Sequence, residues 1–374
     1  MQSESKKILH LITTADRGGA EIQVCMLAVA QKKAGHEVEI CSLKGENELF
    51  KELNHHGVQL LKDFTNRNFF MQLLSFRRLI DSRNYDVIHA HLPRAEILTL
   101  AIKSTSKVLL TRHNSEKFVP WLPKILSNCI SRMVISRADA ITYISRGVAE
   151  YCQENGEIPK KAIQKVVYYG YERKNQKTSD SSSKSTSIER KRDSKINVLT
   201  IGRLVKQKDI GTQLRAIARL MDDNKDLQIE LIIIGDGPLK SELVKEAQQL
   251  KIGDCVTFVG RVSNVYEFLD NADIFILSSE YEGFGLVILE ALDSGVPIYA
   301  SNIPTTREIL GKDFEYLFEV GDDLELSQLL QYFVTYNQYD TSSYNSILKK
   351  FGLKLALENY DTLYTQLKMN SNEN

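Results

Sequence analysis

The chain has little of several features that would assign it to particular classes of protein. Its 374 residues include five cysteines, seven prolines and one tryptophan, and no apolar run approaches the roughly 20 residues that a membrane-spanning helix needs. The cysteines are scattered and odd in number, without the spacing of zinc ligands or of a secreted disulfide framework. The stretch Met1–Lys7 is polar and predicts no secretory leader. We therefore expect a cytoplasmic protein with reduced thiols.

Net charge is also lacking, because 48 Lys and Arg balance 48 Asp and Glu. The balance is uneven along the chain: residues 1–174 contain 26 Lys and Arg against 18 Asp and Glu. A basic half can face an anionic substrate or the negative inner face of a membrane, and it can equally be an ordinary solvated surface. We expect no nucleic-acid partner.

Short apolar runs alternate with amphipathic stretches in both halves of the chain. This alternation indicates βαβ units and parallel sheets, hence an α/β fold. The expected strands are Lys7–Leu11, Glu37–Ser42, Val87–Ala90, Val108–Leu110, Ala140–Tyr143, Val166–Tyr168, Val198–Ile201, Gln228–Ile234, Val256–Val259, Ile274–Leu277 and Ile298–Ala300. The expected helices are Gly19–Ala34, Phe69–Ser82, Asp209–Asp222 and Pro238–Leu250, with residues 327–368 largely helical.

The pattern divides into two domains of the doubly wound, Rossmann-like type. We expect residues 1–173 to form the first domain and 196–345 the second. Residues 174–195 are rich in Ser, Lys, Asp and Glu, as is typical of a linker or flexible insert. Residues 346–374 are predicted to be a helix that crosses back to the first domain. Such folds bind ligands beyond the carboxyl ends of their strands, so we expect the domains to face each other across a ligand-binding cleft.

The most informative stretch is residues 278–291, where a glycine-containing turn follows a buried strand and opens into an apolar helix. Glu282 and Glu290 bracket this turn. Eight helical residues rise about 12 Å, so both carboxylates can face one crevice about as long as a sugar and a phosphate. The N–H groups of the helix start favour an anion between them. This arrangement suits a nucleotide-sugar.

Other glycine turns follow expected strands. Gly18 and Gly19 permit close backbone approach to a ligand, but the further glycines of a dinucleotide-binding motif are missing. Gly202 is followed by Arg203 and Lys208, two cations suited to phosphate or to solvent. The turns at 235–238 and 260–262 either line a ligand cleft or serve only as turns.

Three histidines lie at the ends of expected strands in the first half. His89 and His91 alternate along one strand, and His113 follows the next strand. No carboxylate or cysteine spacing supports a metal site, so we expect no metal and no cofactor. We interpret His89 and His91 as structural groups and His113 as a candidate for contact with a reacting sugar.

Placed together, these motifs resemble the retaining glycosyltransferases of family 4, which have the GT-B fold. The resemblance covers nearly the whole chain and rests on the order and spacing of residues 17–21, 86–91, 111–114, 202–208, 235–238 and 282–290.

The resemblance implies a role for each matching position. Glu290 would hold the nucleotide ribose, and Glu282 the hydroxyls of the donor sugar. Arg203 and Lys208 would stabilise the departing diphosphate, and His113 would lie near the anomeric carbon. The catalytic set implied is therefore Glu282, His113, Arg203 and Lys208. The donor-binding set implied is Gly18, Gly19, Gly202, Arg203, Lys208, Gly260, Arg261, Val262, Glu282, Gly283, Phe284, Gly285, Leu286 and Glu290.

Two segments depart from the family pattern. Tyr169 precedes Gly170 where the family often has asparagine, and residues 301–308 lack the glycines common there. We expect neither segment to touch the principal acids or cations, and both leave the acceptor and the sugar open.

The predicted function is retaining transfer of a sugar from a UDP- or GDP-sugar to a glycan or lipid-linked acceptor, in bacterial surface polysaccharide or glycolipid synthesis. Alternatives are a nucleotide-sugar epimerase or phosphorylase of similar architecture, and a non-catalytic nucleotide-sugar binding subunit. A separate hypothesis is peripheral association with an anionic membrane, through the apolar and basic segments 69–79 and 117–124. Core packing explains their apolar residues equally well.

Overall fold

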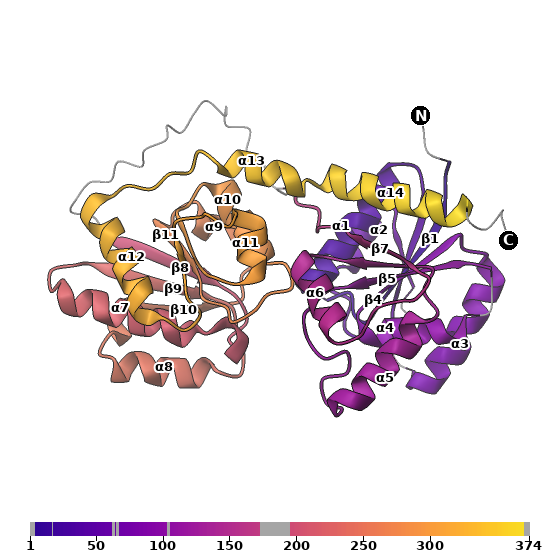
Figure 1. Cartoon of the computed structure of the whole chain (residues 1–374), viewed down its shortest axis with the longest axis horizontal. Helices are drawn as coiled ribbons and strands as arrows, with labels where there is room; N and C mark the ends of the chain where they lie inside the picture. The colour runs from indigo at the N-terminus through magenta and orange to yellow at the C-terminus, as the bar shows by residue number, and fades with distance from the viewer. Residues whose placement is uncertain are drawn as a thin grey trace. The chain divides into compact units, whose positions relative to one another are not determined.

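The computed structural model describes residues 4–16, 18–61, 64, 67–102, 105–172 and 195–369. The chain forms two compact units, Met1–Glu172 with Phe351–Asn374, and Arg173–Lys350 (Figure 1). Each unit contains one parallel sheet covered by helices, which confirms the predicted α/β class. The expected linker lies outside the described residues except for Lys195. Among the described helices, none has the length and apolar character needed to cross a membrane.

The N-terminal unit has a seven-stranded sheet in the order β3-β2-β1-β4-β5-β6-β7, with every pair parallel. Its strands are β1 (Lys7–Ile12), β2 (Glu37–Ser42), β3 (Gln59–Leu61), β4 (Val87–His91), β5 (Lys107–Arg112), β6 (Ala140–Tyr143) and β7 (Ile163–Val166). From β1 the chain adds β2 and β3 on one side of the sheet and then crosses back to add β4 on the other side of β1. The strands β1 and β4 therefore lie side by side near the centre. A ligand site is expected at the carboxyl ends of such strands.

Helices cover both faces of this sheet. They are α1 (Gly19–Lys33), α2 (Phe50–His55), α3 (Phe69–Arg83), α4 (Pro93–Leu98), α5 (Lys124–Ile135), α6 (Arg146–Glu154) and α14 (Leu353–Met369), with the 3-10 helix η1 (Thr99–Ala101). Right-handed crossovers place α1 on one face, and α3, α4, α5 and α6 on the other.

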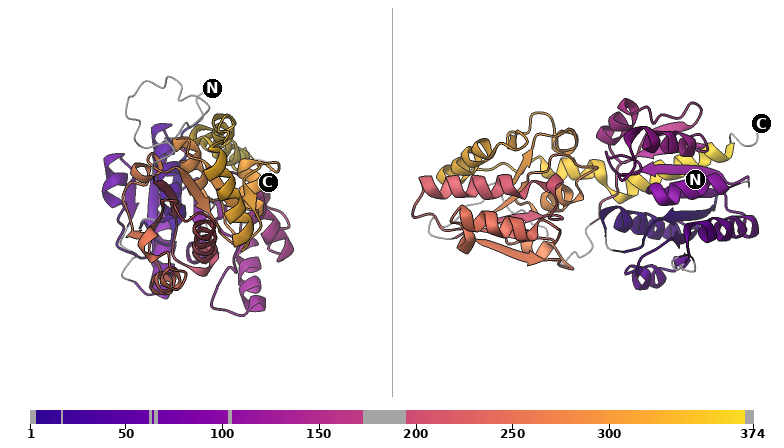
Figure 2. Two further views of the ribbon diagram at one scale, coloured as in Figure 1. Left: turned by 90° about the vertical axis from the view of Figure 1, so that its left-hand side faces the viewer. Right: turned by 90° about the horizontal axis from the view of Figure 1, so that it is seen from below.

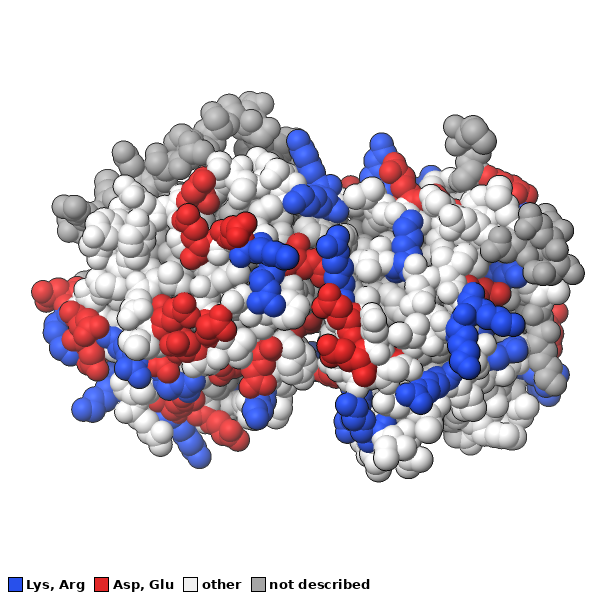
Figure 3. All heavy atoms as spheres, in the orientation of Figure 1, with Lys and Arg blue, Asp and Glu red and all other residues white. Residues whose placement is uncertain are grey.

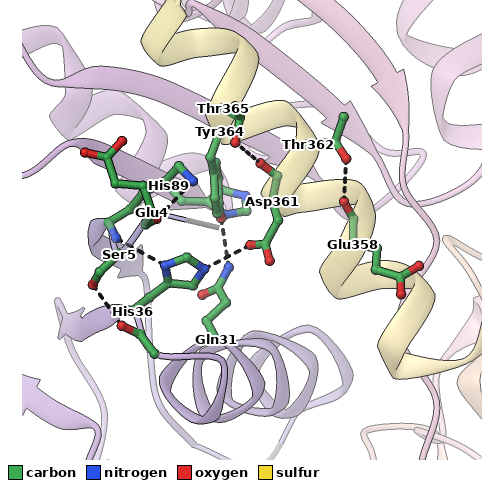
Figure 4. A network of polar contacts seen from close by, with 12 residues as sticks. Glu4, Ser5, Gln31, His36, His89, Glu358, Asp361, Thr362, Tyr364 and Thr365 are labelled. Atoms are coloured by element: carbon green, nitrogen blue, oxygen red, sulfur yellow. Dashed lines mark hydrogen bonds and ion pairs between the residues drawn. The ribbon is translucent and has the colours of Figure 1, made fainter. Parts of the chain in front are cut away.

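The last helix, α14, returns to the N-terminal unit and packs beside α1 (Figures 1 and 2). Its buried side chains Tyr360, Leu363, Tyr364 and Leu367 join a core cluster with Ile8, Leu27 and Val87. Polar contacts add to this packing, since Asp361 Oδ1 accepts from His36 Nε2 at 3.2 Å (Figure 4). The N-terminal core is therefore completed by the far end of the chain.

The C-terminal unit has a six-stranded parallel sheet in the order β10-β9-β8-β11-β12-β13. Its strands are β8 (Ile196–Ile201), β9 (Ile229–Ile234), β10 (Val256–Gly260), β11 (Ile274–Leu277), β12 (Ile298–Ser301) and β13 (Leu317–Phe318). Its helices are α7 (Ile210–Asp223), α8 (Lys240–Gln249), α9 (Tyr266–Leu269), α10 (Leu286–Ser294), α11 (Pro304–Leu310), α12 (Asp323–Tyr336) and α13 (Tyr344–Leu348), with the 3-10 helices η2 (Lys206–Lys208), η3 (Gly253–Cys255) and η4 (Lys349–Phe351).

Several predicted elements differ from the observed ones. The strand expected at Val166–Tyr168 runs instead over Ile163–Val166, and the helix expected from Pro238 begins at Lys240. The short elements α2, β3 and β13 were not predicted. They contain two to six residues each, too few to display a helical or strand period clearly.

Candidate functional site

The strands β8 and β11 lie side by side in the C-terminal sheet, and their carboxyl ends place two loops next to each other. Backbone and side-chain hydrogen bonds join these loops. Glu280 N donates to Gln207 O at 2.8 Å, and Gln207 Nε2 donates to Tyr281 O at 2.7 Å. Ser278 Oγ also donates to Lys208 O at 2.8 Å. The loop containing the predicted cations is therefore fixed to the loop containing Glu282.

This junction brings Lys208 and Glu282 into direct contact across 74 residues of sequence. Lys208 Nζ donates to Glu282 Oε1, and Ser279 Oγ donates to the same oxygen at 2.6 Å. The two side chains are only 16% and 9% exposed. A partly desolvated ion pair with a further hydrogen bond holds both groups in one geometry more firmly than a surface pair would. The sequence predicted both residues as ligand groups but not their contact.

Glycines permit the close packing of these strand ends. A Cβ on Gly202 would lie 3.3 Å from Cδ and Cε of Lys208, so the lysine stem lies against bare backbone. Gly235 has a φ of +133°, and a Cβ there would lie 1.8 Å from Gly202 O. A hydrogen bond also joins the two strand ends, since Gly202 N donates to Ile234 O at 2.9 Å. The turns after β8 and β9 are thus held together by backbone that only glycine allows.

The helix α10 begins directly beyond Glu282. Gly285 has φ 78° and ψ 52°, a left-handed conformation, and Leu286 is the first helical residue. Glu282 lies in the loop, as predicted, but the separation of about 12 Å expected for eight helical residues does not apply, because residues 282–285 precede the helix. The N–H groups at the start of α10 follow Glu282 closely in the sequence. A helix start of this kind favours a bound anion.

Glu290 projects from the second turn of α10. Burial raises the pKa of its carboxyl group to about 7. Near neutral pH the group therefore exists in both protonation states, and it can donate or accept a hydrogen bond. A ribose hydroxyl would be a suitable partner for either state.

The remaining predicted residues of this unit lie at neighbouring strand ends. Arg203 is exposed on the loop after β8. Gly260 ends β10 and accepts a hydrogen bond from Gly235 N at 2.8 Å, with Arg261 and Val262 following. The structure thus gathers the predicted groups of the second half at the carboxyl ends of β8, β9, β10 and β11.

Gly18, Gly19 and His113 belong to the N-terminal unit. Gly18 and Gly19 lie at the start of α1, and Arg17 lies outside the described residues. His113 follows β5 with both ring nitrogens bonded: Nε2 to His91 Nδ1 at 3.1 Å, and Nδ1 to the Tyr169 hydroxyl. Burial, followed by the positive charge of Arg112, lowers the pKa of His113 to about 3. At neutral pH the ring is therefore uncharged, and its low pKa makes it a weak base.

The side chain of the neighbouring Arg112 is buried and contacts protein groups. Its guanidinium lies 3.2 Å from Glu96 Oε2 and 3.7 Å from Glu157 Oε2, and it covers the ring of Phe118. The cavity beside this group has a volume of about 10 Å³, room for about one water molecule. Arg112 is therefore a structural cation that joins α4 and the segment after α6 to the sheet.

The segment 301–308, one of the two that depart from the family pattern, contacts Glu282 and its loop, contrary to expectation. Thr305 Oγ1 donates to Glu282 O at 2.7 Å, and Ser301 Oγ donates to Ser279 O at 2.6 Å. Tyr169 contacts His113. Sequence reasoning also missed Ser279, which donates to Glu282 within the same loop, and Gln207, whose side chain gains its partner only through the loop junction. Small polar residues carry no sequence signal for such a contact.

Two family models match the chain. The model described as Glycosyltransferase Family 4 matches residues 17–170, and the model described as Glycosyl transferases group 1 matches residues 182–355. Together they span most of both units.

Individual proteins are similar over most of the chain. N-acetyl-alpha-D-glucosaminyl L-malate synthase from Bacillus anthracis is 28% identical over 298 residues, covering 75% of this chain and 74% of that protein. A Campylobacter jejuni N-acetylgalactosaminyltransferase, named for an N-acetylgalactosamine-N,N'-diacetylbacillosaminyl-diphospho-undecaprenol substrate, is 25% identical, covering 86% of this chain and 81% of that protein. The structure of Anabaena HepE in complex with UDP-glucose superposes with a TM-score of 0.79 at 19% identity, covering 96% of this chain and 100% of that one.

Proposed function

The chain belongs to glycosyltransferase family 4 and has the GT-B fold, and from this premise we propose that it transfers a sugar from a UDP- or GDP-sugar with retention of anomeric configuration. The observation that carries the proposal is the Lys208–Glu282 pair, fixed at the joined carboxyl ends of β8 and β11. A cation and a sugar-binding carboxylate in contact match the two halves of a sugar diphosphate. UDP-glucose in the structure of HepE, a protein of the same fold, supports a nucleotide-sugar as the donor.

The charges suit the proposed chemistry. Cleavage of a glycosyl–phosphate bond places negative charge on the diphosphate and positive charge on the sugar ring. Lys208, Arg203 and the N-terminus of α10 would stabilise the diphosphate as it leaves. Glu282, held by Lys208 and Ser279, would orient the sugar hydroxyls. Preorganised groups of this kind stabilise developing charge without reorganising during the reaction.

The acceptor we propose is a glycan or lipid-linked saccharide of bacterial surface polysaccharide or glycolipid synthesis. The Campylobacter relative, whose name contains a diphospho-undecaprenol saccharide, supports this class. The enzyme would then work on the cytoplasmic side of a membrane, where nucleotide-sugars and such lipids can meet. An epimerase or a non-catalytic binding subunit would need no acceptor.

Proton NMR of the enzyme with a panel of UDP-, GDP- and ADP-sugars tests this proposal. We expect one UDP- or GDP-sugar to be transferred, or slowly hydrolysed when no acceptor is present, and the first product to keep the donor's anomeric configuration. Conversion of the donor into a different nucleotide-sugar would establish an epimerase instead. Tight donor binding with neither transfer nor hydrolysis would favour a binding subunit.

We also propose that the N-terminal unit associates with anionic membranes through α3 and α5, which lie on the same face of its sheet. Trp121 and Ile125 are 82% and 78% exposed, and they lie beside the exposed cations Lys117 and Lys124. Figure 3 shows Lys and Arg side chains gathered on the part of this unit where α3 and α5 lie. The other exposed apolar residues of these helices are Phe69, Phe70, Met71, Leu74, Leu126 and Met133. Apolar side chains beside cations are typical of interfacial segments.

Vesicle flotation tests this association. We expect the protein to float with phosphatidylglycerol-containing vesicles at low salt and to be released at high salt, because screening weakens attraction between exposed charges. Trp121 is the only tryptophan, so its emission should shift to shorter wavelength on binding. The double variant Trp121→Ser/Ile125→Ser should lose flotation, whereas Leu324→Ser, an exposed apolar residue of the C-terminal unit, should retain it. Equal flotation of all three proteins would refute the assignment.

A further inference from the structure

A continuous row of hydrogen-bonded polar side chains lies on the face of the N-terminal sheet that α1 and α14 cover. We call it the histidine chain, and it runs in order through Tyr169, His113, His91, His10, Gln31, Tyr364, His89 and Thr111. Figure 4 shows its middle part, where Tyr364 of α14 lies between Gln31 of α1 and His89 of β4. The histidine chain thus links the terminal helix α14 to the predicted site residue His113.

The direction of these hydrogen bonds is set at Gln31, because its side-chain oxygen can only accept a hydrogen bond and its side-chain nitrogen can only donate one. Gln31 Oε1 lies 2.7 Å from His10 Nε2, and a carbonyl oxygen only accepts. His10 therefore carries its hydrogen on Nε2. Gln31 Nε2 donates to the Tyr364 hydroxyl at 3.1 Å, so the Tyr364 hydrogen is directed onward.

From His10 the direction passes unchanged to His113. Burial lowers the pKa of His10 to about 4 and that of His113 to about 3, and it holds the pKa of His91 well below its usual value. Each ring is neutral and has one hydrogen. His10 Nδ1 must accept from His91 Nε2 at 3.0 Å, and His91 Nδ1 must accept from His113 Nε2 at 3.1 Å. His113 Nδ1 then accepts from the Tyr169 hydroxyl.

The other branch follows the same rule. The Tyr364 hydroxyl donates to His89 Nδ1 at 2.9 Å, and His89 Nε2 donates to Thr111 Oγ1 at 2.6 Å. Burial holds the pKa of His89 well below its usual value, so this ring is also neutral. All four rings are therefore in the Nε2–H form.

We propose that Gln31 is a positioning residue that fixes the tautomer of His113 through His10 and His91, both of which are buried. The consequence at the end of the chain is specific. The hydrogen of Tyr169 is committed to His113, so towards a ligand hydroxyl the Tyr169 oxygen acts as an acceptor. The relevance of this polarity to sugar binding rests on the proposed function, but the polarity itself does not.

A metal ion is the competing explanation for so many histidines. Ring nitrogens of His10, His89 and His91 lie within 4.8 Å of one another. A metal would require an unprotonated nitrogen from each ring, at about 2.0–2.1 Å for zinc. Two of these nitrogens, His10 Nδ1 and His91 Nε2, instead share one hydrogen at 3.0 Å. All six ring nitrogens of the three residues have protein partners, so hydrogen bonding accounts for the cluster.

Long-range ¹H–¹⁵N NMR of the histidine rings in the full-length protein without substrate tests the proposal. We expect His10, His89, His91 and His113 all to be Nε2–H at neutral pH. In Gln31→Met, a change of similar volume, the Nδ1–H form should become populated at His10, His91 and His113 together. The Nδ1–H form should also become available to His89, because the amide that directs the Tyr364 hydrogen is gone. Gln23→Met, at another buried glutamine of α1, should leave all four rings unchanged.

Several outcomes would overturn the proposal. Four Nδ1–H rings in the natural protein would mean that the chain runs in the opposite direction. A Gln31→Met protein whose His113 keeps one tautomer would show that Gln31 does not set it, and loss of the Nε2–H signals on adding zinc alone would favour a metal site. If Gln31→Met fails to fold, the tautomers of the natural protein still decide the direction. Because no substrate is present, a failure here is separate from a failure of the proposed function.

Discussion

Lys208→Ala and Glu282→Ala are each expected to lower the rate of sugar transfer by at least about a hundredfold, the loss typical of removing one preorganised group that stabilises transition-state charge. Lys208 would no longer neutralise the departing diphosphate, and Glu282 would no longer orient the sugar. The measurement is the initial rate of transfer, or of donor hydrolysis, with the nucleotide-sugar identified by NMR. Each variant should remain folded, because the lost pair costs on the order of 1–3 kcal/mol of unfolding free energy.

The contact between the two residues also predicts how the effects of their substitutions combine. Because Lys208 Nζ donates to Glu282 Oε1, each single substitution leaves a partly buried partner without its ion pair. The double variant should therefore lose much less than the product of the two single losses. Independent losses that multiply fully would mean that the two groups act at separate places.

Neighbouring residues of the same type provide matched controls. Lys206 lies in the same 3-10 helix as Lys208, and Glu280 precedes Glu282 by two residues; both side chains are exposed. Lys206→Ala and Glu280→Ala should transfer sugar at close to the natural rate. Natural rates in Lys208→Ala or Glu282→Ala would instead remove both residues from the proposed site.

Gly235→Ala is expected to destabilise the C-terminal unit by more than about 3 kcal/mol, since both a backbone clash and an unfavourable conformation contribute. The new Cβ would lie 1.8 Å from Gly202 O and 2.8 Å from Gly202 C, atoms that cannot move aside as a side chain can. The φ of +133° adds strain for any L-residue. The turns after β8 and β9 would separate and displace Lys208.

Urea denaturation and hydrogen exchange measured by mass spectrometry would check this expectation. Amides of β8 and β9 should lose protection, whereas those of β1 and β4 in the other unit should not. Gly295→Ala is the control: its φ is +71°, but no atom lies within 4 Å of the added Cβ. It should cost only about 1–2 kcal/mol, the conformational part alone. Equal effects of the two substitutions would show that the contact with Gly202 is unimportant.

Much of the fold could be predicted from the sequence because its signals are local. The strand Ile274–Leu277 was predicted with its observed bounds, since four consecutive apolar residues mark a strand buried on both faces. The helix after Gly285 was also expected. Elements were missed where the signal was short or depended on neighbours, as in β13, which has two residues and pairs with β12.

The candidate site was predicted less completely. Residue types and order predicted Lys208, Glu282 and Glu290 as site residues, because the motifs in this order and spacing resemble one family. Their contacts were not predictable. Thr305 and Tyr169 are ordinary polar residues in the sequence, and each gains its partner from a segment that folds back from elsewhere.

The sequence by itself therefore determined the α/β architecture and the residues that we propose hold a sugar diphosphate, since hydrophobic period and side-chain chemistry are properties of each segment. Only the tertiary structure decided that Lys208 meets Glu282, that Gly235 must lack a side chain, and that Tyr364 of the last helix joins Gln31 and His89. These facts depend on which strand ends and helices become neighbours. Packing of the whole sheet fixes such pairings, so no single segment encodes them.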